Sequence, residues 1–176
     1  MTLGKLVAIG VLFGVGLLGY NMVSWRWEVP ARFEEWMLEP EALRYQPGEG
    51  SVAEGERPYR TGKVFVMKPQ QGDRMTMGSG GFRPPVVDQS YFSLSGSLQA
   101  RYPQDVETLI VAQRGADVDQ HRSGDWIIQT RLPGANIRVY DLKKKILVGC
   151  AFVPIDSDNS YATNLAKYIE SMPERS

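Results

Sequence analysis

The sequence of 176 residues has only one cysteine, Cys150, one histidine, His121, and no excess of charge of either sign. A lone cysteine cannot form a disulfide within the chain, and the apolar residues around it predict a buried, inert thiol. A lone histidine excludes chemistry that needs two imidazoles. Lys plus Arg and Asp plus Glu are 20 each, so the basic excess typical of nucleic-acid-binding proteins is absent. We therefore expect no nucleic-acid partner.

Catalytic motifs are also absent. The glycine-rich run 78–81 is followed by Phe-Arg-Pro-Pro, whereas a phosphate-binding loop needs Lys and Ser or Thr after its last glycine. No G-x-S-x-G motif is present, so a hydrolase built around His121 has no visible nucleophile. The sequence predicts a protein that is not an enzyme and needs no cofactor.

Two short segments carry candidate metal ligands. Asp117, Asp119 and His121 alternate, but their polar surroundings favour a solvated surface loop over a metal site. Residues 156–160 begin like a calcium loop, yet the later glycine and glutamate of such a loop are missing, so helix capping explains them better. Lys143 to Lys145 is a basic run that predicts a solvated turn. The sequence predicts no metal.

An apolar run covers Leu3 to Val23 and is interrupted only by Lys5, Tyr20 and Asn21. Twenty-one helical residues span about 31 Å, which matches a hydrocarbon core of roughly 30 Å. A cleaved signal peptide is the alternative, but the run is long for one and bulky residues follow it. We expect residues 1–23 to be a single-pass anchor in the bacterial inner membrane.

Gly10 and Gly14 form a G-x-x-x-G pair, which lets a second helix approach closely in lipid. Glycine is also common in membrane helices that contact only lipid, and the pattern leaves both readings open. The positive charges before the anchor, Lys5 and the amino terminus, are nearly balanced by Arg26 and Arg32 after it, so the positive-inside rule does not decide the orientation. The short N-terminal tail favours a cytoplasmic amino terminus, so we expect an extracytoplasmic, periplasmic C-terminal domain.

Residues 24–45 predict a juxtamembrane amphipathic collar. Trp25 and Trp27 suit the membrane interface, where indole rings are enriched. A short helix between Pro30 and Pro40 has one apolar side and one glutamate-rich side; its apolar side holds Val29, Phe33, Trp36 and Met37. Helices that bind lipid surfaces usually carry Lys and Arg, so we predict a partner protein as the contacted surface. Lipid and the chain's own domain remain alternatives.

Residues 46–62, rich in glycine and proline, predict a linker, and residues 63–176 predict the folded domain. Beta-branched and aromatic runs predict strands at 63–67, 106–113, 126–132, 136–142 and 146–153. Pro133 and Gly134 predict a turn or bulge, and short connections predict antiparallel neighbours. An apolar face from Tyr161 to Met172, capped by Asn159 or Ser160, predicts a closing helix. The expected fold class is α+β: one transmembrane helix, then a small antiparallel sheet packed by a C-terminal helix.

The segments SLQARYPQDVETLIVAQRGADV, RVYDLKKKILVGCAFV and ATNLAKYIESMP resemble a class of small bacterial envelope domains tethered by lipid or helix. The resemblance covers about Ser90 to Pro173. It implies an α+β fold and an extracytoplasmic location. That class has no assigned function, so the resemblance brings no functional residues with it.

These features together predict a non-enzymatic accessory subunit of a larger membrane protein complex, whose partners are membrane protein subunits and the lipid bilayer. A respiratory or photosynthetic electron-transport assembly is a plausible host. The predicted partner contacts are Gly10, Gly14, Trp25, Trp27, Phe33, Trp36 and Met37. The alternative is a free-standing tethered module that binds or senses a small ligand, which predicts a concave apolar pocket between sheet and closing helix.

Overall fold

The computed structural model describes residues 28–38, 41–69, 85–123, 126–156 and 159–175, and for residues 116–132 it describes the backbone. The predicted anchor, with Gly10 and Gly14, lies outside these residues, and so do Trp25 and Trp27 of the predicted collar. Within the described ranges, no helix has the length and apolar character needed to cross a bilayer.

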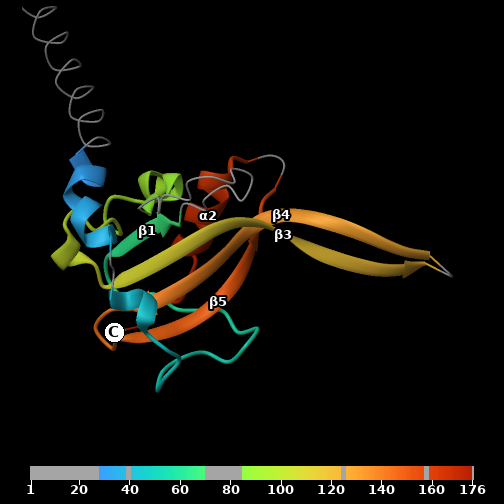
Figure 1. Cartoon of the computed structure of the whole chain (residues 1–176), viewed down its shortest axis with the longest axis horizontal. Helices are drawn as coiled ribbons and strands as arrows, with labels where there is room; N and C mark the ends of the chain where they lie inside the picture. Colours follow the sequence, from blue (N-terminus) through green and yellow to red (C-terminus); the bar gives the residue numbers. More distant parts are fainter. Residues whose placement is uncertain (1–27, 39–40, 70–84, 124–125, 157–158, 176) are drawn as a thin grey trace, which may run out of the picture.

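The described chain has an α+β fold built on one five-stranded sheet (Figure 1). The strand order is β2-β1-β3-β4-β5. A helix at residues 28–38 precedes the sheet, and α2 (Tyr161–Glu170) follows it. The strands are β1 (Val64–Lys68), β2 (Val86–Val87), β3 (Thr108–Ser123), β4 (Trp126–Asp141) and β5 (Ile146–Pro154). Short 3-10 helices are η1 (Glu41–Arg44), η2 (Gln89–Ser93) and η3 (Pro103–Asp105).

The sheet is mixed, which corrects the expected all-antiparallel arrangement. β1 runs parallel to β3, with Val64 opposite Thr108, whereas the β1–β2, β3–β4 and β4–β5 pairs are antiparallel. Short connections force an antiparallel partner, but β1 and β3 are separated by β2, η2 and η3. That long connection lets the chain return to the start of β1 and run alongside it in the same direction.

The two central strands are longer than expected. β4 continues through Pro133 and Gly134, so the predicted turn there is wrong, and residues 117–121 belong to β3 rather than to a loop. Pro133 has no N–H, but no hydrogen bond between β3 and β4 is lost, because its nitrogen faces away from β3. On that outer edge of β4, Pro133 lies one residue beyond Gly134, where the pairing with β5 ends. A Cβ on Gly134 would lie 2.7 Å from the Val153 carbonyl oxygen, so only glycine fits.

Residues 46–62 are part of the fold rather than a separate linker. Along the outer edge of β5, the Val52 N–H donates to the Val148 carbonyl (2.8 Å) and the Leu147 N–H donates to the Gln46 carbonyl (3.1 Å). Further on, Arg60 pairs with the C-terminal segment in a parallel bridge to Glu174. The segment has no apolar period, but its backbone covers the edge of β5, which would otherwise be unpaired.

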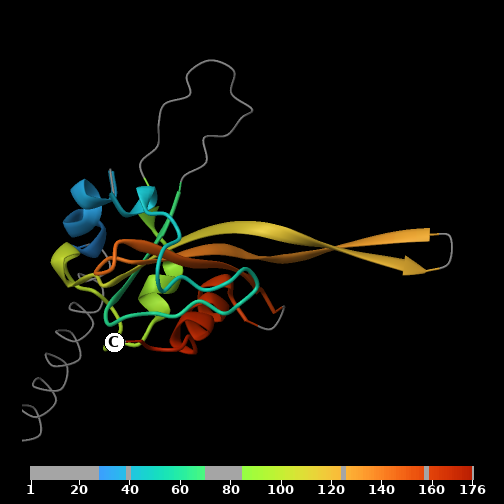
Figure 2. The same cartoon turned by 90° about the horizontal axis from the view of Figure 1, so that it is seen from below.

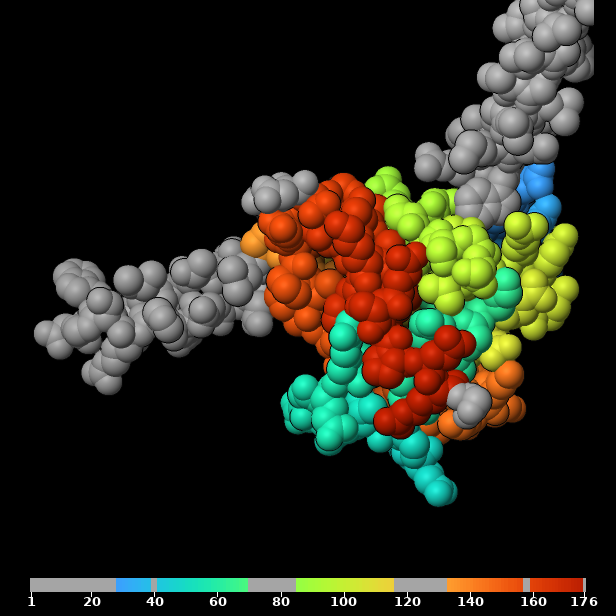
Figure 3. Space-filling model, turned by 180° about the vertical axis from the view of Figure 1, so that it is seen from behind, coloured from blue at the N-terminus to red at the C-terminus, as the bar shows by residue number. Residues whose placement is uncertain are grey.

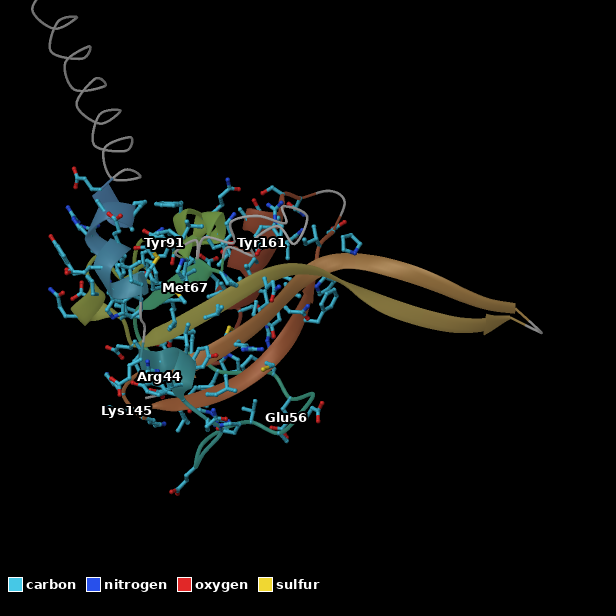
Figure 4. All side chains as sticks on the ribbon, in the orientation of Figure 1. Arg44, Glu56, Met67, Tyr91, Lys145 and Tyr161 are labelled. Carbon is cyan, nitrogen blue, oxygen red and sulfur yellow. The ribbon has the colours of Figure 1, made fainter. Side chains whose placement is uncertain are left out.

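A single hydrophobic cluster joins the helix at 28–38, the sheet, η2 and α2. Met67 and Tyr91 lie inside the body, whereas Glu56 and Lys145 lie at its periphery (Figure 4). The view from behind shows α2 packed beside residues 85–100 (Figure 3). The space between sheet and helices is therefore filled by side chains.

The closing helix is confirmed in position and cap, since the Ser160 hydroxyl accepts the Thr163 N–H (3.2 Å). Cys150 is a correction, because its thiol is exposed and not buried. The register places Cys150 opposite Arg138, which is also exposed, while the neighbouring β4 residues Ile137 and Val139 are buried. Alternation along the strand therefore directs Cys150 away from the core.

Candidate functional site

The helix at residues 28–38, called the collar helix from here on, packs its apolar side on the chain's own sheet. The Phe33 ring stacks on the Phe65 ring of β1, with centroids 3.9 Å apart and planes 8° apart. Trp36 contacts both rings edge-on, at 5.7 and 5.6 Å, and the Tyr91 ring lies 5.2 Å from Phe65. Phe33 has no exposed surface and Met37 is 4% exposed. Aromatic pairs in these geometries stabilise a core beyond the area they bury.

This packing corrects part of the predicted partner surface. Phe33 and Met37 are enclosed by the chain itself, so we assign both to the core, as in the alternative where the helix folds back on its own domain. Trp36 is half-buried, and a partner contact there stays a prediction. The outer side of the helix shows the exposed residues Glu34, Glu35 and Leu38. Gly10, Gly14, Trp25 and Trp27 are not placed.

A polar groove surrounds Glu107, the residue before β3. Three adjoining open hollows, of about 660, 520 and 490 Å³, share its side chain. Lys143, in the turn after β4, places its Nζ 2.7 Å from Glu107 Oε2. Gly62 lies beneath the same carboxylate with φ +40°, and a Cβ there would overlap it. Residues from three distant stretches of chain therefore meet at one point.

Two buried polar side chains line the groove. Asp141 is 1% exposed; its Oδ1 accepts the Lys144 N–H (2.9 Å), while Oδ2 has no partner among the described residues. Arg60 is 9% exposed and pairs with Glu174 at 3.1 Å, leaving Nε and one terminal nitrogen without a partner there. These orphaned atoms are beneath the surface, so they do not form an open binding site.

The groove mixes charges rather than concentrating one sign. Its carboxylates face lysines and arginines, and its lining contains neither cysteine nor histidine. Over the described ranges, no cluster of three or more His, Cys, Asp or Glu side chains could hold a metal ion. Sequence reasoning missed this groove because Gly62, Glu107 and Lys143 belong to no shared motif and meet only through the fold.

A second polar cluster fixes α2 to the rest of the domain. Asp88 is 1% exposed and accepts hydrogen bonds from the Ser90 N–H (2.9 Å) and the Tyr161 hydroxyl (3.3 Å). The Arg114 guanidinium lies 4.3 Å above the Tyr161 ring. Burial, and next the nearby Asp88 carboxylate, raise the pKa of Tyr161 well above its usual value of 10. The cluster holds the phenol neutral, as a structural hydrogen-bond donor.

The most distinctive feature is a ribbon made of the outer halves of β3 and β4. It projects from the body in both views (Figures 1 and 2). Asp117, Asp119 and His121, weighed above as metal ligands, lie in its β3 half and pair in register with Leu132, Thr130 and Ile128. An isolated two-stranded ribbon is only marginally stable in water.

Comparison with known proteins gave no match to a family model, a curated protein or a solved structure.

Proposed function

We propose that this chain is a non-enzymatic accessory subunit of a larger membrane protein complex. The observation that supports it best is the collar helix, which is built into the core through Val29, Phe33 and Met37. A helix fixed in this way keeps the start of the described chain, at Glu28, in one place on the body.

The distance to the proposed anchor is short. Five residues lie between Val23, the end of the apolar run, and the buried Val29. The six Cα–Cα steps that join these two residues span at most about 22 Å when fully extended. The body would therefore stand at the membrane surface as a rigid mount, rather than swing on a flexible tether. A fixed mount suits a subunit that must dock beside other subunits, including those of a respiratory or photosynthetic assembly.

The free-standing ligand-binding module has less support. It required an apolar pocket between the sheet and the closing helix. In the described part of the chain that space is occupied by buried side chains, among them Tyr91, Leu165 and Ile169. The hollows that remain lie around Glu107 and not between the sheet and the closing helix, and charged side chains are prominent in their lining.

An insertion experiment tests the rigid mount. A Gly/Ser segment of about a dozen residues, which behaves as a flexible coil, is inserted between Trp27 and Glu28 in the full chain. A matched control receives the same insertion between Gly55 and Glu56, in an exposed turn where insertions are tolerated. Membranes are extracted in mild detergent and run on native gels.

We expect the unaltered chain and the control to migrate in a particle much larger than the 19.7 kDa chain. The collar insertion should shift most of the chain to a smaller particle. An unaltered chain that migrates alone would refute the accessory-subunit proposal. A large complex that is indifferent to the collar insertion would refute the rigid mount.

A further inference from the structure

The projecting ribbon has two free backbone edges within the described chain. β1 pairs with β3 only as far as Val111, and β5 pairs with β4 only from Gly134 onward. Between these limits and the tip, eight register pairs from Ala116↔Pro133 to Ser123↔Trp126 form two strands without a third. At about 3.4 Å per residue the ribbon is about 27 Å long. Figure 2 shows it clear of the body.

The direction of the free backbone groups follows from one hydrogen bond. The Pro133 carbonyl accepts the Ile155 N–H (2.9 Å), so it faces away from β3. Alternate residues of a strand bond to opposite neighbours, and the β3–β4 register continues without a shift. Ile127, Gln129 and Arg131 therefore present both N–H and C=O on the outer edge of β4. Gln120, the register partner of Gln129, does the same on the opposite edge.

The two edges differ in how many charged residues protect them against pairing with another strand. Residues 116–123 of β3 include three charged residues, Asp117, Asp119 and Arg122. Residues 126–133 of β4 include only Arg131, after the uncharged run WIIQT. Natural proteins guard free edges with charges, and an uncharged run rich in β-branched and aromatic residues favours strand pairing. The β4 edge is the less guarded of the two.

We infer that the outer edge of β4 pairs antiparallel with the same edge of a second copy of this chain, about a two-fold axis at Gln129. The edge is complementary to itself: Gln129 faces Gln129, and Ile127 faces Arg131, so every outward N–H meets a carbonyl. A two-fold contact uses one surface twice and closes on itself. Because the paired strands run in opposite directions, the two bodies lie at opposite ends of a four-stranded ribbon.

A pair of identical substitutions at opposite positions tests this. Gln129→Pro removes an outward N–H from the β4 edge, and Gln120→Pro removes one from the β3 edge; proline is tolerated where the N–H faces outward. Sedimentation velocity of the full chain in detergent micelles should show a dimer for the unaltered chain and for Gln120→Pro. We expect Gln129→Pro to raise the dimer dissociation constant at least tenfold. A monomer throughout, or equal effects of both substitutions, overturns the inference.

Disulfide trapping gives a second readout that does not depend on proline. In a Cys150→Ser background, Gln129→Cys places two thiols on residues whose Cα atoms are about 5.5 Å apart, within disulfide range. Mild oxidation should give a covalent dimer with Gln129→Cys and at least tenfold less with Gln120→Cys. The reverse preference overturns the inference. The inference is independent of the proposed function, because a free-standing dimer would satisfy it while migrating without other subunits.

Discussion

Truncating Phe33 to alanine should destabilise the whole domain. Phe33 has no exposed surface, and its ring stacks on Phe65 at 3.9 Å with Trp36 against its edge. Replacing a buried phenylalanine by alanine costs about 3–5 kcal/mol, because apolar area is lost and a cavity remains. With a urea slope of about 2 kcal/mol/M, a loss of 4 kcal/mol lowers the unfolding midpoint by about 2 M.

The assay is urea unfolding of the full chain in detergent micelles, followed by tryptophan fluorescence. The control is Leu38→Ala, a truncation in the same helix at a side chain that is 43% exposed. A surface change of this kind should alter the free energy of unfolding by less than about 1 kcal/mol. The contrast between the two variants separates core packing from helix propensity.

The result that would refute the reasoning is an unchanged midpoint for Phe33→Ala. It would mean that the collar helix contributes nothing to the fold in solution. The apolar side of the helix would then be free for a partner protein, as the sequence suggested. Equal losses for Phe33→Ala and Leu38→Ala would also contradict the packing described.

Two further outcomes follow from single residues. Gly62→Ala should lower the free energy of unfolding, measured in urea, by more than Gly55→Ala does. Both glycines have positive φ, where alanine costs about 1–2 kcal/mol, but only at Gly62 would the added Cβ also collide with Glu107. Equal losses would contradict that contact. Burial raises the pKa of Tyr91 from 10 to about 12. The folded state therefore holds the phenol proton more tightly than the unfolded state, and the stability that Tyr91 contributes is complete below pH 10 and is lost as the pH rises from about 10 past 12. Tyr91 should account for about 2–3 kcal/mol of the decline, so the decline should be smaller by that amount in Tyr91→Phe, which keeps the contribution of Tyr161; an equally large decline in that variant would refute the assignment.

Local sequence patterns predicted most of the elements but not their connections. The strands at 64–68 and 146–154 and the helix after Ser160 agree with apolar runs and a capping residue. The parallel pairing of β1 with β3 was missed, because the long connection between them carries no signal of direction. The unbroken β4 was also missed, since Pro133 is a turn residue unless its nitrogen lies on a free edge.

The candidate sites depended on the fold even more. Phe33 and Met37 were recognised as one apolar side of a helix, but the pattern does not say which surface covers that side. The groove at Glu107 had no signal, because its residues are brought together from separate segments. The free edge of β4 is defined by where β5 stops pairing, which the apolar composition of 126–132 does not reveal.

The sequence by itself determined the α+β composition, the amphipathic collar and the closing helix, because these depend on residue spacing within a few turns or strand repeats. Only the tertiary structure decided that the collar packs on β1, that residues 46–62 cover the edge of β5, and that β3 and β4 extend into a ribbon. Those outcomes depend on contacts between residues far apart in the chain, whose partners are selected by packing and backbone pairing and not by local pattern.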